Sequence, residues 1–450
     1  MQHSYDGLDR PGGFGGLNLL APLRHRDFRL LWTGMTVSLF GDGIFLIALA
    51  WQVYTLWNAP AALSIVGIFM TISTVACLLP AGVLSDRLDR RMVMLAADLV
   101  RAAAIAVLAG LSLLGAVELW HIAVLASVYG VGTAFFTPAF EAVIPDLLPA
   151  EDLPAANSLD QFVRPIALRL AGPAAGGWII TVAGTGGAFA LDAVSFAFST
   201  AMVLAIGKLP RHEHAAASLG SDIRSGLEFI RGRVWIWGTL ISAAVAYLLF
   251  LGPTEVLLPY LVKNDLHGSA GALGLVFAAG GIGAVGAAVL MGQLGQPRRQ
   301  ITFIYVCWTV ATLAVAGYGL ATASWQLMVV CLLFNALETA GTIVWATLKQ
   351  RHVPAAMLGR VSSLDWLISI GLLPLSFALT APIAAALGTR ETLIGAGVLG
   401  SIATVAALLL PGMRDLDHDD EPEPLSDEPI EVVVTSITLT AGEKPAGTRV

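Results

Sequence analysis

The chain has 450 residues, of which 56% are hydrophobic and only 13% are charged, and its mean hydropathy is +0.77. This small number of charged residues cannot cover the surface of a soluble globule of this length. We therefore expect a membrane protein without a large water-soluble domain. The formal net charge of -7 does not indicate nucleic-acid binding, because much of the acid lies in the tail after Arg414.

Apolar segments long enough to cross a membrane recur along most of the chain. Each reaches the roughly 20 residues that a helix needs to cross about 30 Å of hydrocarbon. The first segment is too long for a signal peptide and has no small-residue cleavage site, so we expect it to be retained. We predict twelve spans, at about 30–55, 61–81, 92–116, 121–143, 161–183, 187–207, 235–260, 270–292, 301–321, 325–347, 362–386 and 391–411.

A short basic loop separates the second predicted span from the third. It contains Gly82, Asp86, Arg87, Arg90 and Arg91 in the spacing Gly-x-x-x-Asp-Arg-x-x-Arg-Arg. The carboxylate can approach a helix N-terminus and the arginines can form charge-assisted hydrogen bonds, so this motif can bridge the cytoplasmic ends of two helix bundles. The alternative is a signal for membrane topology alone.

Basic residues sort to one side of the twelve-span model. Only Lys263 and Arg390 fall on the other side, while Arg101, Arg164 and Arg169 lie within spans. Because Lys and Arg are retained on the cytoplasmic side, we predict an inner (plasma) membrane protein with both termini in the cytoplasm.

Four acidic residues within spans are candidates for carrying a coupling proton. Charged groups inside a membrane are expensive and usually face a cavity. Asp42 and Glu338 fall near the midplane and are the leading candidates, whereas Asp192 and Glu255 lie towards the outside. For each of them a structural ion pair or a position at the rim is the alternative.

Further residues are candidates for a substrate cavity or for a supporting network. Arg164 and Arg169 in the fifth span supply positive charge near the same cavity, and Arg164 can pair with Asp160 one helical turn earlier. Asp98 and Arg101 share one helical face and can extend the Asp86 cluster, although a structural role is favoured. Tryptophans within spans can line an aromatic cavity or anchor the protein at the membrane interface, namely Trp51, Trp308, Trp345 and Trp366.

The three cysteines match no metal-binding spacing, so we expect no disulfide, no metal site and no cofactor. No phosphate-binding loop of the Gly-x-x-x-x-Gly-Lys-Ser/Thr kind is present either, which argues against direct use of ATP. Without a nucleophile or metal constellation, we do not expect an enzyme.

A long hydrophilic interruption and an internal repeat divide the chain. Residues 208–234 include Ile223, Leu227 and Ile230 at helical spacing, which predicts an amphipathic helix at the cytoplasmic surface. The segment 148–160 aligns without gaps on 353–365, at an offset of 205 residues. We therefore predict five parts. They are a cytoplasmic N-terminal segment at 1–29, a six-helix bundle at 30–207, the cytoplasmic linker at 208–234, a second six-helix bundle at 235–412 and an acidic disordered tail at 413–450.

The motifs together resemble those of the major facilitator superfamily. The basic loop is similar to the signature between helices 2 and 3 of that superfamily. Arg26-Asp-Phe28-Arg29, Asp98-Leu-Val-Arg101 and Gly359-Arg360-Val361 are similar to its drug-efflux branch, which includes macrolide exporters and the enterobactin exporter. Arg169 and the segment Gly172-Pro173-Ala-Ala-Gly176-Gly177 resemble the helix-5 motif of antiporters, where small residues form a pliable hinge; plain helix packing is the alternative.

The resemblance implies an all-α membrane protein with twelve transmembrane helices in two parallel six-helix pseudo-repeats, and a substrate site between them near the midplane. It also implies a contact of the basic loop with the start of span eleven near Ser362. We expect a monomeric secondary exporter of small amphipathic molecules that works by alternating access and is driven by protons. Alternatives are a siderophore exporter, a lysophospholipid flippase or, in another class, a transporter-derived sensor or interaction protein.

Overall fold

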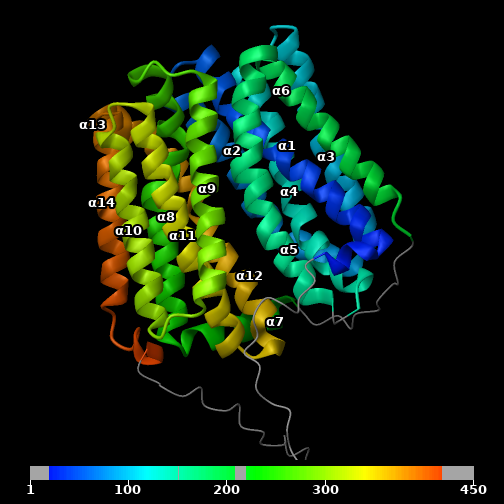
Figure 1. Ribbon diagram of the computed structural model, residues 1–450, viewed down its shortest axis with the longest axis vertical. Helices are drawn as coiled ribbons and strands as arrows, with labels where there is room; N and C mark the ends of the chain where they lie inside the picture. Colours follow the sequence, from blue (N-terminus) through cyan, green and yellow to red (C-terminus); the bar gives the residue numbers. More distant parts are fainter. Residues whose placement is uncertain (1–19, 150–151, 208–218, 418–450) are drawn as a thin grey trace, which may run out of the picture.

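The computed structural model describes residues 20–149, 152–207 and 219–417, and within these ranges the chain contains helices and no strands. The N-terminal half comprises α1 (Arg26–Leu56), α2 (Pro60–Arg87), α3 (Arg90–Leu113), α4 (Leu119–Leu147), α5 (Leu153–Pro165) and α6 (Gly172–Leu204). The C-terminal half comprises α8 (Val234–Tyr260), α9 (Ala270–Leu294), α10 (Gln300–Leu320), α11 (Ser324–His352), α12 (Ala355–Gly371), α13 (Leu373–Leu387) and α14 (Thr389–Leu408). Figure 1 shows the two halves side by side.

Eleven helical stretches of the described chain are long and apolar enough to cross a membrane. The longest, Ala155–Leu204, has 50 residues and would measure about 75 Å as one straight helix, more than twice the hydrocarbon thickness. It is interrupted at Gly184, where φ is 70° and ψ is 177°. Glycine adopts this conformation without the strain that a side chain would add. The break falls between the fifth and sixth predicted spans, so the eleven stretches accommodate the twelve predicted crossings.

Three apolar clusters show how the two halves meet. One cluster is continuous across both halves and includes Phe45 and Val53 together with Phe250 and Val256. Two further clusters each belong to a single half, one around Phe140 and the other around Tyr305. The halves are thus packed together at one end and keep separate cores at the other. We call these the closed end and the α7 end, since the second carries α5, α7 and α12 (Figure 1).

Hydrogen bonds join the halves at the closed end. The hydroxyl of Tyr54 donates to the carbonyl of Val256 at 2.6 Å, and the amide of Asn58 donates to that of Asn264 at 2.5 Å. The ring of Tyr54 also lies edge-on to the ring of Tyr260, with 5.5 Å between centroids. Each half therefore contributes one copy of Tyr-x-x-x-Asn. The first copy starts in α1 and ends in the segment after it, and the second starts in α8 and ends in its π-helical extension η4 (Leu261–Asp265).

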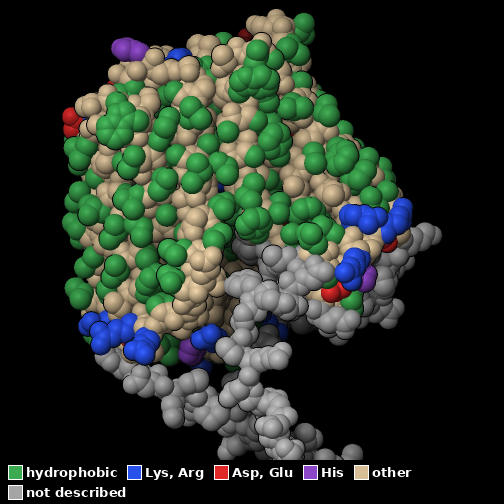
Figure 2. Space-filling view, in the orientation of Figure 1, with side chains coloured by type: hydrophobic (Ala, Val, Ile, Leu, Met, Phe, Trp, Pro, Cys, Tyr) green, Lys and Arg blue, Asp and Glu red, His purple; other side chains and the backbone are tan. Residues whose placement is uncertain are grey.

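The outer surface suits a lipid environment. Figure 2 shows hydrophobic side chains spread over the flanks of the molecule, and Lys and Arg side chains gathered at the α7 end. Large apolar residues such as Phe69, Val107 and Val289 are exposed. In water this exposure would be costly, whereas a bilayer solvates these side chains.

Helix α7 (Leu219–Arg231) follows the part of the linker that lies outside the described residues. It packs on α12 and α8, and the guanidinium of Arg360 in α12 donates to the hydroxyl of Ser225 at 3.1 Å. At the other limit of the described chain, the carboxylate of Asp417 accepts the backbone N–H groups of Ile301 and Thr302 and so caps α10. Residues 418–450 of the predicted tail lie outside the described residues.

Candidate functional site

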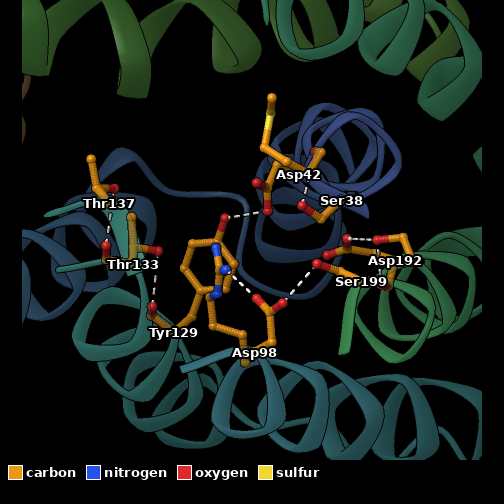
Figure 3. A network of polar contacts seen from close by, with 11 residues as sticks. Ser38, Asp42, Asp98, Tyr129, Thr133, Thr137, Asp192 and Ser199 are labelled. Carbon is orange, nitrogen blue, oxygen red and sulfur yellow. Dashed lines mark hydrogen bonds and ion pairs between the residues drawn. The ribbon is translucent and has the colours of Figure 1, made fainter. Parts of the chain in front are cut away.

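A buried polar cluster lies among α1, α3, α4 and α6 of the N-terminal half (Figure 3). Asp42 of α1 is buried, and the hydroxyl of Tyr129 in α4 donates to its Oδ1 at 2.5 Å. The ring of Tyr129 stacks on Phe45 at 4.7 Å, which fixes its direction towards the carboxylate. Asp42 therefore belongs to a network that involves four helices.

Asp98 and Arg101 form the second part of the cluster. Arg101 Nη2 donates to Asp98 Oδ1 at 2.5 Å, and the hydroxyl of Ser199 donates to Asp98 Oδ2 at 2.7 Å. The guanidinium of Arg101 lies 4.5 Å from the ring centroids of both Phe136 and Phe196. A planar cation between two aromatic faces, with a charged hydrogen-bond partner, is held firmly despite its burial.

Asp192 of α6 completes the cluster and is fully buried. The hydroxyl of Ser195 donates to its Oδ1 at 3.2 Å, whereas its Oδ2 has no partner among the described residues. A Cβ atom at Gly41 would lie 2.3 Å from Asp192 Oδ1, so only glycine lets this carboxylate rest on α1. Asp192 interacts electrostatically with Asp42, although we placed it towards the outside from the sequence.

The cluster contains more acid than base. Asp42, Asp98 and Asp192 all experience the charge of Arg101, and of these three carboxylates Asp42 is the one that also experiences the charge of Arg164. Because burying an uncompensated carboxylate is costly, this excess of acid marks the cluster as a candidate functional site.

Glu338, the other leading acid, lies in separate surroundings in the C-terminal half. It lines a pocket that we call the aromatic pocket, because Tyr247, Phe250, Trp308 and Phe334 form much of its wall. The hydroxyl of Thr342 donates to Glu338 Oε1 at 3.2 Å. Asp42 and Glu338 thus belong to different halves, as we expected, but share no contact that would relay a proton directly.

Arg169 connects the two halves beside this pocket. It lies in the π-helical segment η3 (Ile166–Ala171), between α5 and α6. Its Nη1 is 3.7 Å from Glu338 Oε2 and donates to Asn335 Oδ1 at 3.2 Å. Glu255 of α8 is exposed and interacts electrostatically with the same guanidinium. Two of the four predicted acids therefore face one arginine from the opposite half.

The predicted cavity residues occupy different environments. Arg164 pairs with Asp160 at 3.2 Å, as the spacing predicts. Trp345 is buried in the core of the C-terminal half and donates to Asp365 Oδ2 at 3.0 Å. Trp366 is mostly exposed. Of the four tryptophans considered from the sequence, Trp308 is the one that lines the aromatic pocket.

The side chains of Gly82, Asp86 and Arg87 from the basic-loop motif lie outside the described residues. The two remaining arginines contact the N-terminal half. Arg90 bonds Asp146 at 2.8 Å, and Arg91 donates to the carbonyl of Leu204 at 2.6 Å. The predicted contact with α12 near Ser362 stays a prediction.

The helix-5 motif forms two very close contacts. Gly172 and Gly176 face α1 of their own half, where a Cβ at Gly176 would lie 3.0 Å from Ile44 Cα. Gly177 faces α9 of the other half, where a Cβ would lie 2.7 Å from the carbonyl oxygen of Ala270. Pro173 lies beside Gly274 of α9 through its carbonyl oxygen. The motif is thus a backbone-to-backbone contact surface on both sides.

Sequence reasoning missed several residues of these sites. Tyr129 and Ser199 carry no local signal, because a hydroxyl in an apolar helix often bonds its own backbone. The Tyr-x-x-x-Asn pair at the closed end does carry a signal. Asn58 and Asn264 are 206 residues apart, close to the offset of the internal repeat.

Comparisons with known proteins agree with this architecture. The model of a family described as "Transmembrane secretion effector" (MFS_3) matches residues 17–437. The chain is 24% identical to macrolide efflux protein A of Streptococcus pyogenes, over 87% of this chain and 97% of that protein. It is 27% identical to the multidrug efflux pump Tap of Mycolicibacterium fortuitum, over 87% and 97%, and 27% identical to the enterobactin exporter EntS of Citrobacter koseri, over 91% and 97%.

Solved structures share the fold. The nucleoside transporter NupG (D323A mutant) superimposes with a TM-score of 0.64 at 12% identity, over 87% of this chain and 100% of that chain. A bacterial homologue of the iron transporter ferroportin superimposes with a TM-score of 0.61 at 18% identity, over 86% and 100%. The helical halves, the motif set and a family match over most of the chain lead to one assignment. This protein belongs to the transmembrane secretion effector family of the major facilitator superfamily.

Proposed function

We propose that this protein exports small amphipathic molecules from the cytoplasm in exchange for protons, by alternating access. The observation that carries the proposal is the acid-rich cluster of Asp42, Asp98 and Asp192, buried within one half beside a single bonded guanidinium. Such a cluster can hold a proton while the two halves change their relative orientation. The family assignment and the names of the relatives support the direction of transport and the class of substrate.

The distribution of charge supports an orientation. Lys and Arg side chains gather at the α7 end, and basic residues are retained on the cytoplasmic side of membranes (Figure 2). The α7 end, where the halves keep separate cores, then faces the cytoplasm, and the closed end faces outwards. In this state the protein would receive substrate from the cytoplasm.

The two sites suggest a division of labour. The N-terminal cluster binds and releases the proton. The Arg169–Glu338 pair, 3.7 Å apart, connects the two halves and so responds to their relative arrangement. Protonation of the cluster changes its net charge, which alters the cost of separating α6 from α9. Exchange requires that substrate and proton favour different arrangements of the halves.

The test is transport by the purified full-length chain in proteoliposomes. Ethidium efflux should follow an imposed pH gradient and stop when a protonophore collapses it. Transport that persists unchanged without the gradient would exclude proton coupling. Binding without any transport would favour a sensor, and transport of enterobactin or lysophospholipid in place of ethidium would favour a siderophore exporter or a flippase.

A further inference from the structure

The aromatic pocket has the chemistry of a cation site. Four aromatic rings line it, and Glu338 is the single charged residue in its wall. Phe250 lies edge-on to both Tyr247 and Phe334, at 5.7 Å and 5.6 Å between centroids. Aromatic faces attract cations, and an adjacent carboxylate adds direct charge pairing. An anion would instead meet the carboxylate and find no basic residue in the wall.

The pair of Arg169 and Glu338 is a loose one. The separation of 3.7 Å exceeds the roughly 2.7–2.9 Å of a well-formed charged hydrogen bond. Arg169 is half-exposed and shares its Nη1 with Asn335. The carboxylate of Glu338 is therefore only partly engaged, and a second cation can compete for it.

We propose that the aromatic pocket binds the cationic group of an amphipathic substrate, and that Arg169 is the internal cation which this substrate displaces from Glu338. The inference rests on the proposed function only in assuming that the bound molecule is transported; the binding itself does not depend on that function. Because Arg169 belongs to the N-terminal half and Glu338 to the C-terminal half, displacement removes a charged contact between the halves. Occupancy of a pocket within one half is thereby coupled to the arrangement of both.

The experiment compares two ions of the same shape and opposite charge. Calorimetry on the purified full-length protein in detergent should show binding of tetraphenylphosphonium but not of tetraphenylborate. Glu338→Gln should weaken tetraphenylphosphonium binding by about tenfold or more. Arg169→Gln should strengthen it, because the competing cation is gone. If Glu338 and Arg169 had only structural roles, the two substitutions would not change the affinity for tetraphenylphosphonium in opposite directions.

The matched control is Glu141→Gln, the same change at an exposed acid within α4 that does not line the pocket. It should leave the affinity for tetraphenylphosphonium within about twofold. Unchanged binding in Glu338→Gln, or weaker binding in Arg169→Gln, would overturn the proposal. Transport without an effect of Glu338→Gln on binding would refute this inference alone, whereas binding as described without transport would refute the proposed function alone.

Discussion

At the scale of single residues, Asp192 differs most from its expected role. From the sequence it lies towards the outside, yet its carboxylate rests on Gly41 and interacts with Asp42. One of its oxygens has no partner among the described residues. These observations make it as strong a candidate for proton coupling as Asp42.

We predict that Asp42→Asn and Asp192→Asn each abolish efflux driven by a pH gradient while substrate exchange continues. An amide can replace the neutral acid but cannot release a proton. The measurement is driven efflux and counterflow in the same vesicles, with Glu141→Gln as the control acid. If driven efflux survives in both variants, these carboxylates do not carry the coupling proton.

Arg101 leads to a prediction about stability. Arg101→Leu removes the partner of Asp98 and leaves a buried carboxylate, which costs about 3–5 kcal/mol. The double variant Asp98→Asn/Arg101→Leu removes the uncompensated charge as well. Thermal unfolding in detergent should therefore rank the double variant above Arg101→Leu. The reverse order would mean that Asp98 is sufficiently stabilised by its remaining partner, the hydroxyl of Ser199, and is not left uncompensated when Arg101 is removed.

At the scale of helices, the glycine motif separates into two surfaces. Gly176 packs on α1 within the same half, whereas Gly177 packs on α9 of the other half. Only the second surface lies where the halves meet. The break at Pro165 and η3 immediately before it gives this part of the chain an irregular hydrogen-bond pattern.

We predict that Gly177→Ala slows transport at least severalfold without loss of folded protein. The new Cβ would lie 2.7 Å from the carbonyl oxygen of Ala270, so α6 and α9 must separate. Gly286→Ala is the matched control, because a Cβ at this glycine of α9 meets nothing within 4 Å. Initial rates in vesicles, normalised to folded protein, decide the matter. Equal rates for the two variants would make the close approach irrelevant to transport.

At the scale of the whole molecule, the two halves are joined by a symmetric contact at the closed end. Asn58 faces Asn264 across the division, and Tyr54 faces Tyr260. Each pair comes from corresponding positions, in α1 and the segment after it on one side and in α8 and η4 on the other. Contacts between equivalent residues are expected where two repeats are related by an axis between them.

We predict that Asn58→Cys/Asn264→Cys forms a cross-link under oxidation, in a background without the three native cysteines. The link should stop transport, because this end can no longer open, and a reductant should restore it. Each single variant serves as a control and should stay active under oxidation. Full transport by the cross-linked protein would show that the closed end need not separate.

The amino-acid sequence by itself determined that the chain is a helical membrane protein with many apolar helices, because the length of an apolar segment is a local property. It also ended one predicted span just before Gly184 and paired Arg164 with Asp160, since both depend on near neighbours in the chain. The family motifs could be recognised from the sequence because each consists of residues that are close together in the chain.

Only the tertiary structure decided which charged groups meet. Asp192 joins Asp42, and Arg169 approaches Glu338, because of the rotation and packing of helices that are far apart in sequence. Small changes in rotation would turn either acid towards lipid or towards another helix, and the sequence pattern within one span does not fix that angle. The aromatic pocket likewise exists because four helices, α8, α10, α11 and α14, each direct side chains into one space.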